Sequence, residues 1–212
     1  MYPIMWKAEG RRCLIAGGGH VALRKARGLL EEGALVTVVA PEADAAVAEL
    51  ASEGRLIWDK RRYRPGEGRA YAFLFSASGD EETARAMAED AAAAGALFDA
   101  ADFPALGNCV IPARIRRGRL TVAVSTGGLS PAFSKEVKHS LEDRLPEAYG
   151  DWLERLASLR ELAKHHIDGA GKREKFWRLA FGAGVMALVK EGRLDEAEEI
   201  IRHEIGCFGT ES

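Results

Sequence analysis

The feature that most constrains the fold is a glycine-rich turn that follows a short apolar run. Residues 12–16, Arg-Cys-Leu-Ile-Ala, lead into Gly17-Gly18-Gly19-His20-Val21-Ala22, which is a G-x-G-x-x-A pattern. Apolar residues then return at helical spacing up to Leu30, and Gly33 stands where a left-handed helix cap is expected. A strand that enters a tight glycine turn and leaves as a helix is typical of the first βα unit of a dinucleotide-binding fold.

Each small residue of this turn has a physical reason. Gly17 permits the tight turn, Gly19 has no Cβ to block a pyrophosphate, and Ala22 lets the helix pack closely, while the first helical amides face the phosphates. A glycine-rich turn can also be only a turn, but its place between a strand and a helix favours the cofactor interpretation. We therefore predict cofactor contacts at Gly17, Gly19, His20 and Val21.

Strand-like and helix-like segments then alternate along the first half of the chain. The expected strands are residues 35–40, 56–58, 72–77 and 97–100, and the expected helices among them are residues 43–51 and 81–94. Strands separated by helices indicate a parallel sheet with right-handed crossovers. The predicted fold class is α/β, a Rossmann-type doubly wound parallel sheet.

The pattern changes at about Pro112. Residues 114–119 are basic, and the alternating run 120–125 predicts a hairpin outside the parallel sheet. Ser130 and Pro131 are a suitable N-cap and first helical residue for a helix to about residue 145. From residue 151 only helices are expected, over 152–162, 175–189 and 195–205, with Asp195 as the N-cap of the last.

Composition excludes several classes of protein. A formal charge of -2 argues against nucleic-acid binding. The three cysteines are scattered, which favours free thiols in a reducing compartment, and His165 and His166 point in different directions on a helix, so we predict no metal site. Without a signal-peptide pattern or an apolar run of about 20 residues, we expect a cytoplasmic protein with no membrane partner.

The choice of cofactor depends on the end of the second expected strand. An acidic residue that holds the ribose hydroxyls is usual about 20 residues after the glycine turn. Here Pro41 is followed by Glu42, slightly later than that position. Because an anionic Glu42 would repel a 2′-phosphate, we predict NAD in preference to NADP, with Pro41 and Glu42 in contact with it.

Two further segments are candidates for chemistry. Asp99 and Asp102 follow a strand at the carboxyl edge of the sheet, where they are suited to act as orienter and base, or to make Asx turns ahead of Pro104. Residues 125–131 place hydroxyls and glycine amides at a helix N-terminus, which suits an anion-binding nest or an ordinary capped turn. The sequence leaves both alternatives open in each case.

Taken together, these segments resemble the precorrin-2 dehydrogenase / sirohydrochlorin ferrochelatase family, as standalone enzymes or as the N-terminal half of bifunctional sirohaem synthases. The resemblance does not extend to the methyltransferase half of the bifunctional members, so we expect uroporphyrinogen methylation to need another protein. The chain has Asp99-Ala-Ala where the family usually has Asn-Val-Val, and Ala84 replaces a common asparagine. The matching stretches are Cys13 to Lys25, Val36 to Pro41, Phe75 to Ser78, Asp102 to Pro104, Ile111 to Ala113, Val124 to Pro131 and Lys172 to Trp177.

The resemblance implies an assembly and an activity. It implies a homodimer whose chains have an NAD-binding Rossmann domain (1–112), a dimerisation segment (113–148) and a C-terminal helical domain (149–212). It implies NAD-dependent oxidation of precorrin-2 to sirohydrochlorin, with Asp102 as the essential base and Ser78 beside the adenosine. Some members also insert Fe²⁺, for which no protein metal ligands are expected. If Asp99 is close to Asp102, repulsion between the two charges raises one of their pKa values.

A tetrapyrrole with many carboxylates also needs cations. The candidates to bind it are Arg114, Arg117, Thr126, Gly127, Gly128 and Lys135, with Arg116, Arg119 and Lys138 nearby. The basic segment is equally explained as a solvated turn. The alternative function is a non-catalytic, dimeric NAD-sensing module, and a generic hydroxy-acid dehydrogenase lacks an evident acid/base pair.

Overall fold

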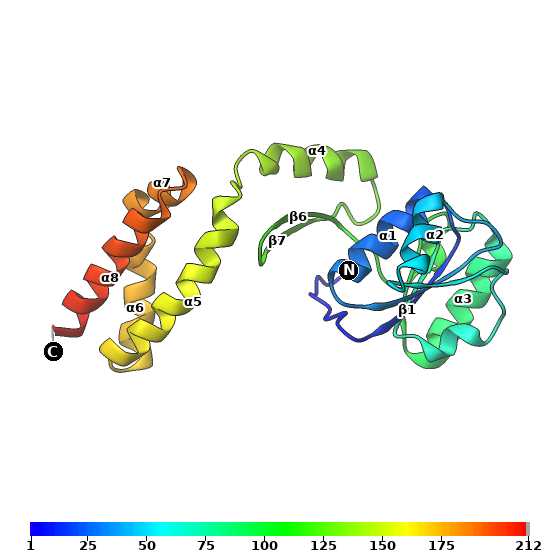
Figure 1. Cartoon of the computed structure of the whole chain (residues 1–212), viewed down its shortest axis with the longest axis horizontal. Coiled ribbons are helices and arrows are strands. Elements are labelled where there is room, and N and C mark those ends of the chain that lie inside the picture. Colours follow the sequence, from blue (N-terminus) through cyan, green and yellow to red (C-terminus); the bar gives the residue numbers. More distant parts are fainter. Residues whose placement is uncertain (211–212) are drawn as a thin grey trace. The chain divides into compact units, whose positions relative to one another are not determined.

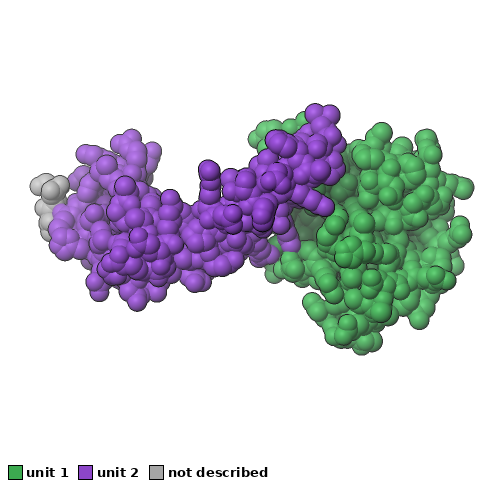
Figure 2. Space-filling model, turned by 90° about the horizontal axis from the view of Figure 1, so that it is seen from above, with its two compact units in different colours: residues 1–111 green, residues 112–212 purple. Residues whose placement is uncertain are grey.

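The computed structural model describes residues 1–210, which form two compact units divided between Ile111 and Pro112. Figure 2 colours the two units separately. Each unit has its own core of buried apolar side chains. None of the helices in the described part of the chain is long and apolar enough to cross a membrane.

Unit 1 is a five-stranded, fully parallel sheet with strand order β3-β2-β1-β4-β5. Its strands are β1 (Arg12–Ala16), β2 (Leu35–Val39), β3 (Ile57–Asp59), β4 (Phe73–Ser76) and β5 (Leu97–Ala100). Its main helices are α1 (His20–Glu31), α2 (Ala45–Ser52) and α3 (Glu81–Ala94), which are labelled in Figure 1. The central strands are buried along nearly their whole length, which is why they have continuous apolar runs.

The two faces of this sheet have separate cores. Ile15 and Val38 pack with α1 and α2 on one face, whereas Leu14, Leu74 and Phe98 pack with Met87 of α3 on the other. Helices on both faces of a parallel sheet make the doubly wound fold, so the predicted fold class is confirmed.

The outer edge of β5 is closed by a side chain. Asn108 Oδ1 accepts a hydrogen bond from the Phe98 N–H at 2.8 Å, and Asn108 Nδ2 donates to the Ala96 carbonyl at 2.8 Å. The Asn108 N–H also donates to the Phe98 carbonyl. The side chain of Asn108 therefore takes the place that a neighbouring strand would have.

Unit 2 begins with an antiparallel hairpin of β6 (Ala113–Arg117) and β7 (Leu120–Val124), as predicted. The hairpin turn at Gly118 lies against Gly150, where an added Cβ would stand 2.8 Å from the Gly118 nitrogen. The unit continues with α4 (Pro131–Glu142), α5 (Ala148–His166), α6 (Ala170–Ala180), α7 (Ala183–Lys190) and α8 (Leu194–Thr210). Its core includes Leu159, Phe176 and Ile201.

Three details of the predicted helices are wrong. The single helix expected over 175–189 is two helices, because Gly182 adopts extended backbone angles (φ -57°, ψ 164°) between α6 and α7. Helix α4 ends at Glu142 and not at residue 145. Helix α8 begins at Leu194, so Asp195 lies in its first turn and is not its N-cap.

Candidate functional site

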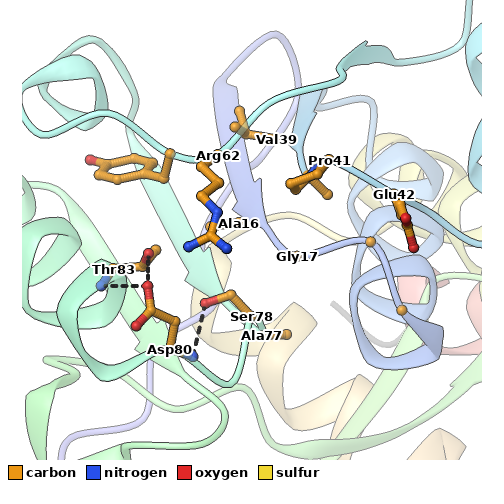
Figure 3. A pocket seen from close by; sticks show the side chains of 14 residues that line it. Ala16, Gly17, Val39, Pro41, Glu42, Arg62, Ala77, Ser78, Asp80 and Thr83 are labelled. Carbon is orange, nitrogen blue, oxygen red and sulfur yellow. Dashed lines mark hydrogen bonds between the residues drawn. The ribbon is translucent and has the colours of Figure 1, made fainter.

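The carboxyl ends of β1, β2 and β4 border a cavity of about 420 Å³ within unit 1. Open parallel sheets bind their ligands at this edge. Figure 3 shows its lining, which the glycine turn and the loops after β2, β3 and β4 supply. The lining residues are Ala16, Gly17, Gly18, Gly19, Val39, Ala40, Pro41, Glu42, Arg62, Tyr63, Ala77, Ser78, Asp80 and Thr83.

The first two glycines of the turn are required by close packing. Gly17 has φ +117°, and a Cβ added there would meet the Ala77 carbonyl oxygen at 2.3 Å. A Cβ on Gly18 would stand 2.2 Å from the Glu42 carbonyl oxygen. The turn is therefore wedged between the loops that follow β4 and β2, and only glycine fits at either position.

Gly19 differs from its two neighbours, because an added Cβ would meet nothing within 4 Å. Gly19 is the N-cap of α1, where no side chain accepts a hydrogen bond from the helix, and the first turn of α1 contains no acidic residue. The first amides of α1 thus have neither a side-chain cap nor a neighbouring carboxylate of that turn. Open space beside uncapped helical amides suits the diphosphate of a dinucleotide.

The loop after β2 supplies the acidic wall of the cavity. Pro41 and Glu42 both line it, and the Asp44 N–H donates to the Gly18 carbonyl at 2.8 Å. Asp44 also caps α2 by accepting from the Ala46 N–H at 3.0 Å. A carboxylate after the second strand is the group that holds ribose hydroxyls in folds of this kind.

The loop after β4 supplies polar groups opposite. Ser78 Oγ accepts a hydrogen bond from the Asp80 N–H at 3.3 Å, and Asp80 Oδ2 accepts from Thr83 Oγ1 at 2.5 Å. These bonds are drawn in Figure 3. The Thr83 hydrogen bonds lower the pKa of the Asp80 carboxyl, which therefore stays ionised as the N-cap of α3.

Only some of the predicted cofactor residues lie at the cavity. Gly17, Gly19, Pro41, Glu42 and Ser78 all line the cavity. His20 and Val21 are exposed at the start of α1 and are not among the lining side chains. Four polar side chains of the lining were not predicted from the sequence: Arg62, Tyr63, Asp80 and Thr83. Their position after the third and fourth expected strands was the available signal.

Asp102 is hydrogen-bonded to the loop that lines this cavity. Its Oδ2 accepts from the Gly79 N–H at 2.9 Å, and Gly79 stands between the lining residues Ser78 and Asp80. The Asp102 side chain itself is exposed and does not line the cavity. This bond ties the loop after β5 to the loop after β4.

Asp99 has a different environment, although it is only three residues away. It is buried, its Oδ2 lies 3.8 Å from Lys25 Nζ of α1, and it accepts from the Ile111 N–H at 3.2 Å. Burial raises the pKa of the Asp99 carboxyl, while Lys25 and the Ile111 N–H act in the opposite direction. The shift thus comes from burial, and Asp102 is not among its causes.

The candidate anion-binding residues of unit 2 lie in a turn whose hydroxyls accept hydrogen bonds from the turn's own amides. Thr126 Oγ1 accepts from the Ser130 N–H at 3.1 Å, the Gly127 N–H donates to Ser125 Oγ at 3.2 Å, and Gly128 has φ +88°. Ser130 caps α4 as predicted, accepting from the Phe133 N–H.

The basic candidates of unit 2 lie on the hairpin and on α4. Arg117 donates to the Leu145 carbonyl at 2.7 Å and pairs with Glu147 at 3.1 Å, so its guanidinium is already engaged. Arg114 is partly buried on β6, and Lys135 is exposed on α4. In the described part of the chain, no three His, Cys, Asp or Glu side chains form a cluster that could hold a metal ion.

The parallel sheet, the glycine turn and the cavity at the carboxyl edge are the features of a dinucleotide-binding fold. Three family models match the chain in order: "Putative NAD(P)-binding" over residues 4–113, "Sirohaem biosynthesis protein central" over 117–144 and "Sirohaem synthase dimerisation region" over 148–205. The chain therefore belongs to the family of precorrin-2 dehydrogenases and sirohaem synthases, and the resemblance seen in the sequence is confirmed.

Individual relatives agree with this assignment. The chain is 37% identical over 210 residues to a sirohaem synthase of Chromobacterium violaceum, covering 99% of this chain and 45% of the relative. It is 33% identical to that of Methylococcus capsulatus, covering 94% of this chain and 42% of the relative. The chain thus spans less than half the length of these curated relatives. A solved structure, "SirC, precorrin-2 dehydrogenase", superposes with a TM-score of 0.75 at 28% identity and covers 94% of this chain and 100% of that one.

Proposed function

We propose that this chain oxidises precorrin-2 to sirohydrochlorin with NAD⁺ as the hydride acceptor. The observation that carries the proposal is the likeness to the precorrin-2 dehydrogenase SirC, which extends over the whole of that chain. The glycine turn and the open space at Gly19 support it, because they are the features that a bound dinucleotide requires. We place this activity in the cytoplasm.

The proposed cofactor contacts follow from the cavity. Gly17 and Gly19, with the first amides of α1 at His20 and Val21, hold the diphosphate. The turn at Pro41 and Glu42 receives the adenosine ribose, with Ser78 on the adenosine side. We propose NAD⁺ in preference to NADP⁺ because the Glu42 carboxylate would accept hydrogen bonds from ribose hydroxyls and would repel a 2′-phosphate. When bound, the nicotinamide ring supplies the hydride acceptor.

The proposed base is Asp102. Its Oδ2 is held by the Gly79 N–H, which fixes the carboxylate beside the loop that lines the cavity. We assign to Oδ1 the proton that leaves the macrocycle when the hydride departs. The exposed position of the carboxylate gives a large substrate access to it.

The proposed substrate contacts lie in unit 2. Arg114 and Lys135 pair with carboxylates of the tetrapyrrole, and the amides of Gly127 and Gly128 with the Thr126 hydroxyl receive another. Arg117 joins them only by exchanging the Glu147 carboxylate for one of the substrate. We keep the division into residues 1–112, 113–148 and 149–212, and a homodimeric assembly, as parts of this proposal.

The test is an anaerobic absorbance assay with enzymatically prepared precorrin-2 and NAD⁺. Asp102→Asn keeps an oxygen that accepts the Gly79 N–H but cannot take the proton. We expect sirohydrochlorin from the wild type, a rate about a hundredfold or more lower from Asp102→Asn, and equal NAD⁺ affinity for both proteins. Fe²⁺ added afterwards tests iron insertion in the same cuvette.

The same assay separates the alternatives. NAD⁺ binding without any spectral change would overturn the dehydrogenase and favour the NAD-sensing module. Full activity of Asp102→Asn would remove Asp102 from the role of base while leaving the reaction intact. Faster turnover with NADP⁺ than with NAD⁺ would contradict the role given to Glu42.

A further inference from the structure

The cavity has a single basic side chain among its described lining residues. Glu42 and Asp80 line it with carboxylates, whereas Arg62 contributes the one guanidinium. Figure 3 shows this guanidinium pointing into the cavity, toward Ser78 and Asp80. A dinucleotide brings two negative phosphates into this acidic surrounding, so a positive charge at this place favours its binding.

Arg62 is held so that its side chain is presented to the cavity. On one side, Arg61 forms ion pairs with Asp59 at 2.9 Å and Glu67 at 2.7 Å, and its Nη1 donates to the Arg62 carbonyl at 3.1 Å. On the other side, the Tyr63 hydroxyl donates to the buried carboxylate of Asp90 on α3. Both neighbours of Arg62 are thus anchored in unit 1.

The Asp90 anchor is itself well supported. Its carboxylate also accepts from the Gly66 N–H at 2.7 Å and from Arg69 Nε at 3.0 Å. In contrast, the guanidinium of Arg62 makes no hydrogen bond or ion pair with any residue that the structure describes. An arginine whose backbone is anchored through both neighbours, and whose guanidinium keeps its five donors, is suited to bind an anion.

We propose that Arg62 binds the diphosphate of the dinucleotide from the side opposite the amides of α1. The proposal rests on the proposed cofactor and names a residue of its site that the glycine turn does not reveal. The diphosphate is favoured over a 2′-phosphate because Arg62 faces the loop after β4, whereas the ribose hydroxyls are assigned to Glu42 after β2. The charge of Arg62 acts on Asp80 of that loop and lowers its pKa further.

The test is isothermal titration calorimetry of Arg62→Ala, Arg62→Lys and Arg64→Ala with NAD⁺, ADP, adenosine and NADP⁺. Arg64→Ala is the matched control, since Arg64 is exposed, two residues away and not part of the lining. We expect Arg62→Ala to weaken NAD⁺ and ADP about tenfold and to leave adenosine unchanged. Arg62→Lys keeps the positive charge but lacks the planar set of donors of a guanidinium. We expect its affinity for NAD⁺ and ADP to lie between those of the wild type and Arg62→Ala.

The results that would contradict the proposal can be told apart. Equal losses in Arg62→Ala and Arg64→Ala, or an equal loss for adenosine, would overturn the diphosphate contact. A much larger loss for NADP⁺ than for NAD⁺ would overturn it in favour of a 2′-phosphate contact. A wild type that binds neither NAD⁺ nor ADP would overturn the proposed cofactor as well, whereas unchanged binding by Arg62→Ala would overturn this inference alone.

Discussion

Two glycine-containing turns lead from a strand into a helix, one in each unit. They differ in whether a side chain caps the first amides of the helix. In unit 1, the turn before α1 ends at Gly19, which offers no side chain to the first helical amides. In unit 2, the turn before α4 ends at Ser130, whose Oγ accepts from the Phe133 N–H, while Thr126 Oγ1 accepts from the Ser130 N–H.

The difference separates a helix start that a ligand can cap from a helix start that its own serine already caps. The amides at a helix start need acceptors, which come either from cap side chains or from a ligand. The turn of unit 1 uses its glycines to fit between neighbouring loops and leaves its amides for a ligand. The turn of unit 2 uses the hydroxyls of Thr126 and Ser130 to cap the amides at the start of α4, and its glycines Gly127 and Gly128 supply positive φ angles.

The largest effect is expected from Gly18→Ala in comparison with Gly128→Ala. The Cβ on residue 18 would collide with the backbone of Glu42 and Ala43, which is expected to cost ~2 kcal/mol or more of unfolding free energy. The Cβ on residue 128 would meet nothing within 4 Å, so only the φ of +88° is strained, at about 1 kcal/mol. Denaturant unfolding of both variants measures the two costs, and equal costs would contradict the contrast.

The next largest effect compares Gly19→Ala, which is expected to lower NAD⁺ affinity, with Ser130→Ala, which is expected to lower stability. Gly19→Ala places a methyl group in open space beside the cavity and is expected to weaken NAD⁺ binding about tenfold while costing less than about 1 kcal/mol of stability. Ser130→Ala is expected to cost about 1 kcal/mol and to leave NAD⁺ affinity unchanged. Titration calorimetry with NAD⁺ measures the affinity of both variants, and thermal unfolding measures their stability. A loss of affinity in Ser130→Ala would break the comparison.

The smallest effect concerns pH and is expected in unit 1 alone, where Asp99 pairs with Lys25 of α1. Because the folded-state pKa of Asp99 is raised, the folded protein keeps this proton to higher pH than the unfolded chain. The free energy of unfolding therefore falls as pH rises from the ordinary carboxyl value of 3.8 through the raised value. Asp99→Asn has no such titration.

The measurement for Asp99 is the difference in unfolding free energy between wild type and Asp99→Asn across that pH range. We expect the difference to move in favour of the asparagine variant as pH rises. Hydrogen exchange locates the change, which should affect β5 and α1 and leave α5 and α8 unaltered. A difference that is constant with pH would contradict the raised pKa.

The sequence predicted the sheet well because periodicity and glycine placement are local signals. The strand ends at Ala16, Val39 and Ser76 lie within one residue of the predicted ends, and a glycine, proline or serine follows each within two residues. The single helix expected over 175–189 was wrong because Gly182 lies within an otherwise apolar pattern, and only tertiary packing decides whether a glycine breaks a helix.

The site was harder to predict, since it depends on which loops meet. The glycine turn marked Gly17 and Gly19 directly, but Arg62 belongs to a loop after a three-residue strand with no motif of its own. Likewise, spacing alone suggested that Asp99 and Asp102 act together, whereas the strand alternation sends Asp99 toward α1 and the loop brings Asp102 to Gly79.

The amide of Asn108 has a consequence for the behaviour of the protein at high concentration. An edge strand with unpaired backbone groups is a template on which another chain can add a strand, and this leads to aggregation. Asn108 occupies the Phe98 N–H and the Ala96 carbonyl on the outer side of β5, so these groups are not available for such pairing. We therefore expect solubility during overexpression to depend in part on the Asn108 carboxamide, which an aspartate replaces as an acceptor but not as a donor.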